Sequence, residues 1–144
     1  MKLVETSQGN LYIGSKDDVL TVMEEIPQIK FDIIWNLAEE LDFLIHDEKL
    51  YAKTVLTANI EDYGIPEDKA EFLRQLALVV SVLRNGGDVL VHCFGGCGRT
   101  GMGLAAIKIM LDKLSSAAAL IFADNQCDGP ETSEQKQFVI SLTG

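Results

Sequence analysis

The chain has 144 residues and carries 12 Lys and Arg against 22 Asp and Glu, for a formal net charge of −10. This length fits one domain over residues 1–144, large enough to fold without a metal or disulfide. The acidic balance argues against binding to nucleic acid or to an anionic membrane surface, because both require a basic face. It stays compatible with a small positive pocket inside an acidic surface.

The sequence shows no run of apolar residues long enough to span a membrane, and its first residues have no apolar signal core. We therefore expect a cytoplasmic protein, a monomer by default. Cys93, Cys97 and Cys127 are an odd number of cysteines in a chain of ordinary size. They do not form the framework of a secreted disulfide protein, so we expect them as thiols in a reducing compartment.

Strands and helices are expected to alternate along the chain. Turn signals, apolar runs and helical spacing place strands at 3–15 (two short pieces), 31–37, 51–60 and 88–92, and helices at 17–26, 67–84, 99–113, 116–124 and 132–142. We expect Glu39 and Glu40 to be a solvated strand end, rather than to orient Arg99, and residues 44–48 to be an exposed acidic loop. The alternation predicts an α/β fold with a central, mostly parallel sheet flanked by helices.

The most informative stretch runs from Val89 to Gly101, where a buried strand leads through a Gly-rich loop straight into a helix. Glycines allow successive backbone N–H groups to point inward at an anion, and the helix start adds its unpaired N–H groups and positive dipole end. Arg99 supplies a planar guanidinium that matches a tetrahedral oxyanion. The expected phosphate-binding residues are Phe94, Gly95, Gly96, Cys97, Gly98 and Arg99. The Gly-Lys-Ser/Thr ending of a nucleotide-binding loop is absent.

Cys93 opens this loop and would lie beneath a bound phosphorus atom. The loop N–H groups, the helix dipole and Arg99 all favour its thiolate form, which makes it the candidate nucleophile. Thr100 can donate a hydrogen bond to the sulfur and help it leave. His92 is expected to brace the loop through its ring nitrogens rather than to act as the base.

Metal binding is a weaker interpretation of the same cysteines and histidines. Zinc ligands come in close pairs, which Cys93 and Cys97 do not form, and glycines with an arginine suit an anion better. We expect no metal and no other cofactor. Cys97, four residues after Cys93, is a candidate redox partner that could condense with a sulfenic acid on Cys93, and Cys127 is the other candidate. The alternative for both is a small buried apolar residue.

The motif His-Cys-x₅-Arg-Thr-Gly at 92–101 resembles the signature loop of the cysteine-dependent protein tyrosine phosphatases. The chain length resembles the compact dual-specificity branch of that superfamily, and residues 10–15 are similar to the start of many such domains. The resemblance implies a protein tyrosine phosphatase-like fold. It also implies hydrolysis of a phosphomonoester through a phosphocysteine intermediate.

That family uses a general acid from a mobile upstream loop. Residues 60–66 fit its Asp-x-x-x-Pro pattern with Asp62 and Pro66, so Asp62 would protonate the leaving oxygen and then activate water. Asp62 and Cys93 each follow an expected strand. If these two strands are parallel, both loops lie at the same edge of the sheet. Glu61 is the nearby competitor for this role.

Residues 131–135 resemble the family's Gln-Thr-x-x-Gln loop, which positions the hydrolytic water. Glu131 stands where that pattern has its first Gln, so Gln135 is the candidate for water positioning.

The residue types in the loop and near it indicate the class of substrate. Positions 94–98 contain no lysine, which relatives that cleave inositol phosphates often have there. Phe94 and Tyr63 could flank an aromatic phosphoester, so the expected partner is a protein or peptide carrying phosphotyrosine, with phosphoserine or phosphothreonine as further substrates. The alternative substrates are a small phosphorylated metabolite, a lipid head group or an RNA 5′ end. The alternative function is a non-catalytic scaffold that binds phosphate.

Overall fold

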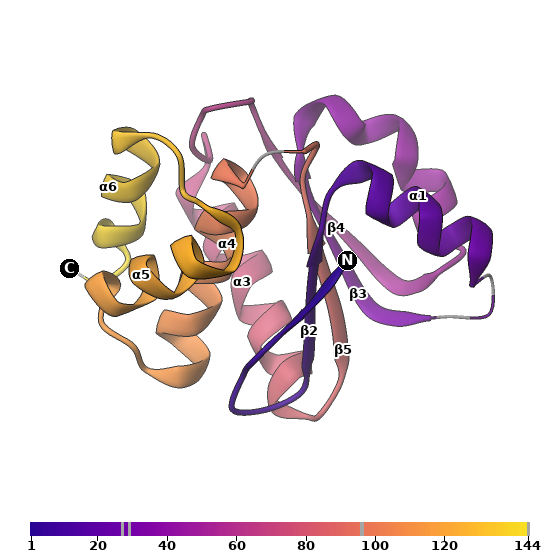
Figure 1. Ribbon diagram of the computed structural model, residues 1–144, viewed down its shortest axis with the longest axis horizontal. Coiled ribbons are helices and arrows are strands. Elements are labelled where there is room, and N and C mark those ends of the chain that lie inside the picture. The colour runs from indigo at the N-terminus through magenta and orange to yellow at the C-terminus, as the bar shows by residue number, and fades with distance from the viewer. Residues whose placement is uncertain (27, 29, 96, 144) are drawn as a thin grey trace.

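The structure, a computed structural model, describes residues 1–26, 28, 30–95 and 97–143. Its strands form one sheet in the order β1-β2-β5-β3-β4 (Figure 1). β1 pairs antiparallel with β2, and the other neighbouring strands pair in parallel, which confirms the predicted mostly parallel sheet. The strands are β1 (Lys2–Val4), β2 (Asn10–Gly14), β3 (Phe31–Ala38), β4 (Ala52–Ile60) and β5 (Asp88–His92).

The helices agree with the predicted ranges, apart from one segment. They are α1 (Lys16–Glu25), the 3₁₀ helix η1 (Glu39–Leu44), α2 (Ile45–Glu48), α3 (Lys69–Arg84), α4 (Gly98–Asp112), α5 (Ser116–Cys127) and α6 (Ser133–Ser141). η1 and α2 occupy the segment expected as a strand end and a loop. The apolar residues of η1, Leu41 and Leu44, are buried at a spacing of three. That single turn is too short to register as helical periodicity in the sequence.

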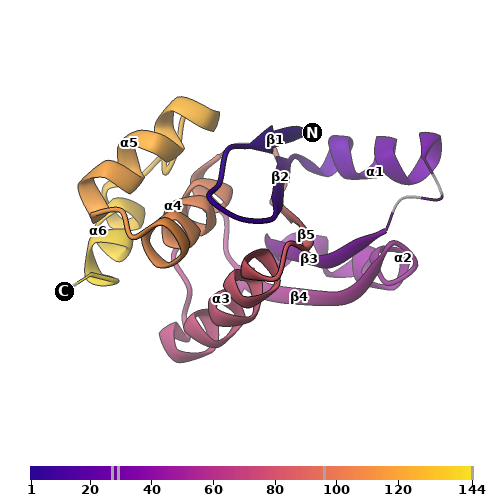
Figure 2. The same ribbon diagram turned by 90° about the horizontal axis from the view of Figure 1, so that it is seen from below.

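Helices cover both faces of the sheet. α3, α4, α5 and α6 lie on one face, and α1 lies on the other (Figure 2). The larger core packs β-strand residues such as Val89 and Val91 against α3 and α4, whereas Leu90 between them joins Val19 and Val22 of α1 in a smaller core. Because both faces are buried, the central strands consist of continuous apolar runs. Within the described ranges, no helix has the length and apolar character needed to cross a membrane.

The parallel pairing brings three strand ends to one edge of the sheet. β3 lies between β4 and β5, with Ala38 in register with Ile60 and Asn36 in register with His92. The segments that follow these strands therefore begin side by side at the upper edge in Figure 1. They carry Glu40, Asp62 and Cys93, and this is how residues more than 50 positions apart in the sequence come to form one site.

Candidate active site

Cys93 and Thr100 meet at the floor of the Gly-rich loop. Cys93 follows β5 directly and is 2% exposed. Thr100, in the first turn of α4, donates a hydrogen bond from Oγ1 to the Cys93 sulfur over 3.0 Å. The turn from the loop into α4 thus places a hydroxyl donor on the sulfur that the sequence predicts to be the nucleophile. A donor in this position stabilises a thiolate.

Arg99 lies buried beside them and points toward the ends of β3 and β4. Its guanidinium donates to both carboxylate oxygens of Glu40, at 2.5 and 2.8 Å, and to the carbonyl oxygen of Ile60 at 3.0 Å. Burial works to lower the pKa of Arg99, but the hydrogen bonds and charge of Glu40 raise it overall. The expectation that Glu40 does not orient Arg99 was therefore wrong, although the Glu40 side chain stays 39% exposed. Glu40 orients Arg99, because η1 turns the chain back over the sheet edge.

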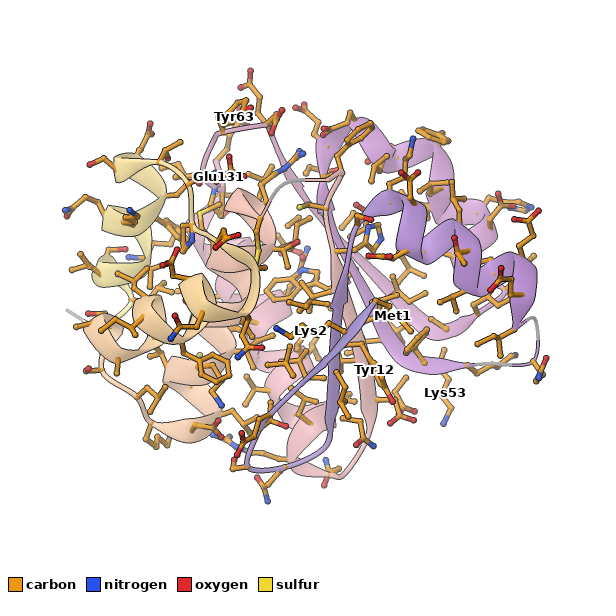
Figure 3. All side chains as sticks on the ribbon, in the orientation of Figure 1. Met1, Lys2, Tyr12, Lys53, Tyr63 and Glu131 are labelled. Carbon is orange, nitrogen blue, oxygen red and sulfur yellow. A yellow bond between two sulfur atoms is a disulfide. The ribbon has the colours of Figure 1, made fainter. Side chains whose placement is uncertain are left out.

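Asp62 lies at the mouth of the site. Its Oδ1 is 3.5 Å from Nη2 of Arg99, and its side chain is 62% exposed. Asp62 Oδ1 also accepts a hydrogen bond from the backbone N–H of the next residue, Tyr63. The predicted acid thus lies next to the arginine that is predicted to bind phosphate, and it remains open to solvent, as a group that exchanges protons requires. Tyr63 is exposed at the same end of the molecule (Figure 3).

His92 is fully buried below the loop and has a partner that the sequence did not reveal. Its Nε2 lies 2.7 Å from Oε2 of Glu48, and its Nδ1 lies 3.4 Å from the carbonyl oxygen of Cys93. Glu48 is also fully buried and accepts a hydrogen bond from Asn36. The ring therefore spans from the loop to α2, and the bracing of the loop by His92 stays a prediction. No sequence signal identified Glu48, because its neighbours in the chain are polar and exposed.

The carboxylate of Glu131 occupies two backbone donors of the loop. Its Oε1 accepts hydrogen bonds from the N–H groups of Cys97 and Gly98, at 3.0 and 2.9 Å. The sequence marked Glu131 as a departure from the family pattern but gave no sign of this contact. A side-chain anion on these donors shows that the start of α4 binds negative charge, as expected for a helix N-terminus.

Gln135 lies beside the loop with its amide committed to backbone groups. Its Oε1 accepts from the N–H groups of Glu131 and Thr132, and its Nε2 donates to the carbonyl oxygen of Gly64 in the segment after Asp62. A Cβ atom on Gly98 would lie 2.8 Å from Gln135 Oε1, so a larger residue at position 98 would displace this amide. Water positioning by Gln135 stays a prediction.

The entrance of the loop is attached to the start of α1. The backbone N–H of Lys16 donates to the carbonyl oxygen of Phe94, and the Lys16 ammonium lies 4.7 Å from the centre of the exposed Phe94 ring. Gly95 is exposed next to it. Gly96, also predicted to bind phosphate, lies outside the described residues. The described part of the entrance thus presents one cation and one aromatic ring.

Cys97 and Cys127 form a disulfide between the loop and the end of α5. This corrects the expectation that these cysteines are reduced thiols. It also joins the two candidate redox partners of Cys93 to each other. Their sulfurs are within bonding reach because the turn after α5 packs directly on the loop: a Cβ atom on Gly129 would overlap the carbonyl oxygen of Cys97.

A pocket of about 680 Å³ opens beside the loop. Its wall includes Gly95, Cys97 and Thr100 on one side, Ser15 before α1, and Glu131 after α5. The loop thus borders a space large enough for part of a ligand beyond its phosphate group.

Comparison with known proteins agrees with this geometry. Residues 17–113, more than half of the chain, match the family model described as a polymorphic toxin system DSP-PTPase phosphatase. The chain belongs to this phosphatase family. The matched range begins in α1 and ends just after α4, so it includes Asp62, His92, Cys93 and Arg99.

Individual relatives are similar over different shares of the chain. The tyrosine phosphatase 197R of Invertebrate iridescent virus 6, so named provisionally, is 28% identical over 105 residues, which cover 71% of this chain and 37% of the viral protein. The chain thus matches little more than a third of the length of that relative.

Solved structures show the same fold. The crystal structure of Tk-PTP in its active form superposes with a TM-score of 0.75 at 24% identity, covering 94% of this chain and 91% of Tk-PTP. Human DUSP28 gives a TM-score of 0.72 at 19% identity, covering 98% and 94% of the two chains. PTPMT1, solved in complex with PI(5)P, has a TM-score of 0.59 at 18% identity and covers 92% and 89%. The fold is therefore shared with these solved structures, one of which holds PI(5)P.

Proposed function

We propose that this phosphatase hydrolyses phosphotyrosine in proteins, with phosphoserine and phosphothreonine as further substrates, through a phosphocysteine intermediate. The observation that carries the proposal is the 3.0 Å hydrogen bond from Thr100 to the Cys93 sulfur, at the base of an anion-binding loop. A buried sulfur next to a hydroxyl donor and a buried arginine suits a thiolate that attacks phosphorus.

In the first step, the Cys93 thiolate attacks phosphorus in line with the leaving oxygen. Arg99 and the loop N–H groups hold the equatorial phosphate oxygens as the sulfur–phosphorus bond forms. Asp62 gives its proton to the leaving oxygen, whose bond to phosphorus breaks. The position of Asp62, 3.5 Å from the Arg99 guanidinium and open to solvent, supports this role over Glu61.

In the second step, water attacks the phosphocysteine. Asp62, now ionised, takes a proton from the water as the new oxygen–phosphorus bond forms. The sulfur–phosphorus bond breaks and Cys93 leaves as a thiolate, to which Thr100 donates its hydrogen bond. Phosphate then leaves, and the enzyme is back in its starting state, with Asp62 protonated and Cys93 a thiolate. His92 braces the loop throughout.

The entrance supports an aromatic phosphoester as the substrate. The ring of Phe94 is exposed in the loop and that of Tyr63 is exposed directly after Asp62, and both can pack against a phosphotyrosine ring. Lys16, above the Phe94 ring, adds a cation for acidic groups near the phosphorylated residue. A phosphoinositide is the second substrate class to test, because the same fold in PTPMT1 holds PI(5)P.

The test is hydrolysis of para-nitrophenyl phosphate in EDTA, with and without reductant, by wild type and Cys93→Ser. We expect turnover in wild type and its loss in Cys93→Ser, with retained affinity for the ester. Turnover by Cys93→Ser, or none by folded wild type, would contradict the proposal. Matched phosphotyrosine, phosphoserine and phosphothreonine peptides, together with phosphoinositides, then identify the substrate. Faster release of phosphate from lipids than from every peptide would overturn the protein substrate.

A further inference from the structure

The segment that carries Asp62 is a tight turn whose backbone sets the position of the carboxylate. The N–H of Gly64 donates to the carbonyl oxygen of Glu61 at 2.8 Å, which closes a β-turn. Within that turn, Oδ1 of Asp62 accepts from the N–H of Tyr63 at 3.1 Å. Because the Asp62 side chain is 62% exposed, packing does little to place it. The position of the carboxylate therefore depends on how the turn is held.

The turn contains a backbone conformation that needs support from its surroundings. Tyr63 has a φ of 61°, in the left-handed region, which is unfavourable for a residue with a bulky side chain. Such conformations persist where neighbouring contacts hold them, and they are found most often at functional sites. The Tyr63 side chain is exposed and packs little. We therefore looked for support at the two ends of the turn.

A buried side chain binds the backbone at each end. Arg99 donates from Nη1 to the carbonyl oxygen of Ile60, just before the turn, at 3.0 Å. Gln135 donates from Nε2 to the carbonyl oxygen of Gly64, the last residue of the turn, at 3.1 Å. Arg99 is 3% exposed and Gln135 is fully buried. The turn with Asp62 is thus fixed between the arginine that is predicted to bind phosphate and the start of α6.

The amide of Gln135 is itself oriented by the start of α6. Its Oε1 accepts from the N–H groups of Glu131 and Thr132 at 3.0 and 3.2 Å. In return, Oγ1 of Thr132 accepts from the N–H of Gln135 at 3.1 Å, which completes a capping box. Because the amide oxygen faces two donors, Nε2 must be the atom that faces Gly64. The same two donors use both lone pairs of the oxygen, so the amide cannot also accept from an attacking water.

We propose that Gln135 is a positioning residue that holds Asp62 in place for proton transfer, through its hydrogen bond to the carbonyl oxygen of Gly64. This inference rests on the proposed function, because it concerns the general acid of that reaction. Gln135 acts on the backbone of the turn. This role differs from the positioning of the hydrolytic water, which the sequence pattern predicts for it.

The experiment compares kcat/KM for phosphoesters with different leaving groups in wild type and Gln135→Met. The methionine side chain has a similar length but no N–H to donate to Gly64. Because kcat/KM covers the reaction only up to departure of the leaving group, it does not report hydrolysis of the phosphocysteine. We expect kcat/KM to fall about five- to tenfold for phenyl phosphate, since the acid is less often in place. For para-nitrophenyl phosphate, which depends less on the acid, the change should stay within about twofold.

A double variant tests whether Gln135 acts through Asp62. When Asp62→Asn has already removed the acid, adding Gln135→Met should lower kcat/KM for phenyl phosphate by less than about twofold. If the two losses instead multiply, Gln135 does not act through Asp62 and the proposal fails.

Hydrogen exchange of the backbone follows the turn without any turnover. In wild type, the N–H of Gly64 is protected by its hydrogen bond to Glu61. Gln135→Met should speed the exchange of a peptide covering residues 60–66 about five- to tenfold, because the turn opens more often. Exchange in β5, residues 88–92, should stay unchanged. Unaltered exchange at 60–66 in folded Gln135→Met would overturn the proposal.

Matched variants separate the contact with Gly64 from the stability of α6. Gln137→Met makes the same substitution at an exposed position of that helix and should change neither measurement. Thr132→Val removes the other half of the capping box but leaves the Gln135 amide, so it should keep the wild-type dependence on the leaving group. Gln135→Glu keeps the capping box, and its carboxylate has no N–H for Gly64, so it should behave as Gln135→Met does. It also keeps the test open if Gln135→Met does not fold.

The outcomes distinguish this inference from the proposed function. If Gln135→Met leaves kcat/KM unchanged for every ester but lowers kcat and accumulates phosphocysteine, Gln135 positions the water and the proposal fails. A steeper dependence in Thr132→Val equal to that in Gln135→Met would also overturn it, since the order of α6 would then be the cause. A folded wild type that hydrolyses no phosphoester would overturn the proposed function, and hydrogen exchange at 60–66 would still test whether Gln135 holds the turn.

Discussion

Arg99 and Glu40 form a two-pronged ion pair, with both carboxylate oxygens of Glu40 accepting from the guanidinium at 2.5 and 2.8 Å. The two residues are 59 positions apart, on α4 and η1. Arg99 is 3% exposed, so its long side chain is held before any substrate arrives. A planar guanidinium fixed on one edge by a carboxylate can present its remaining donors to phosphate without further ordering.

Glu40→Gln should therefore weaken substrate binding. The amide can accept one hydrogen bond but carries no charge, so Arg99 loses its fixed orientation. We expect KM for para-nitrophenyl phosphate to rise about five- to tenfold, which corresponds to about 1 kcal/mol of lost charge-assisted bonding. Glu39→Gln is the matched control, since Glu39 is an exposed neighbour with the same charge. Equal effects of the two substitutions would show that only the net charge matters.

The same pair makes stability depend on pH. Hydrogen bonds from Arg99 hold the pKa of Glu40 below its ordinary value of 4.5, against the opposing effect of burial. A lowered folded-state pKa means that the unfolded chain binds the proton more readily. The contribution of Glu40 is therefore complete above pH 4.5 and is lost as the pH falls through the lowered pKa. Urea unfolding should show Glu40→Gln less stable than wild type near neutrality, and the difference should shrink in acid. A constant difference would contradict the linkage.

The disulfide between Cys97 and Cys127 should stabilise the fold, because it joins residues 30 positions apart. Closing a loop of that length lowers the entropy of the unfolded chain by an amount worth about 3–4 kcal/mol. Reductant should then lower the melting temperature of wild type by roughly 10 °C. Cys127→Ser should melt at the reduced wild-type temperature and not respond to reductant. Cys93→Ser should respond as wild type does. A wild type that melts unchanged after both thiols are titrated would refute this prediction.

Glu131 should compete with phosphate for the loop. Its carboxylate accepts from the N–H groups of Cys97 and Gly98, which are donors predicted to bind the substrate phosphate. Glu131→Gln removes the like charge, so inorganic phosphate should inhibit about three- to tenfold more tightly, for roughly 1 kcal/mol of relieved repulsion. Glu134→Gln, an exposed acid in α6, is the control. An unchanged inhibition constant in Glu131→Gln would mean that phosphate does not use these two donors.

The fold could be predicted from the sequence because the patterns that mark its strands and helices are regular. The central strands are continuous apolar runs, and the three long helices α3, α4 and α5 have clear ends. The helix predicted from residue 67 begins at Lys69, because Asp68 caps it by accepting from the N–H of Glu71. That Cys93, Arg99 and Thr100 lie together could also be predicted, since all three belong to one loop and the helix that follows it.

The partners of that cluster come from elsewhere in the chain and were harder to predict. Glu40 had a usable signal: it follows β3 as Asp62 follows β4, and parallel strand ends meet at one edge. Glu48 had none, since its burial depends on how η1 and α2 fold back on Asn36. The disulfide depends on the packing of the turn after α5 against the loop, which cysteine spacing does not encode.

Asp62→Asn tests the assignment of the general acid. The asparagine cannot protonate the leaving oxygen, so turnover should fall most for esters whose leaving groups are poor. We expect a loss of about 10²–10⁴-fold for an alkyl or phenyl phosphate and a much smaller loss for an activated aryl ester, whose leaving group departs without a proton. The readout is the dependence of kcat/KM on leaving-group basicity, which should become steeper in the variant.

Glu61→Gln is the matched control for that measurement, because it removes the same charge one residue earlier in the chain. It should keep the wild-type dependence, since of these two acids Asp62 is the one whose carboxylate lies 3.5 Å from Arg99. A steeper dependence in Glu61→Gln, with Asp62→Asn losing activity equally for all esters, would reverse the assignment. Asp62 would then act on Arg99 by charge, and Glu61 would supply the proton.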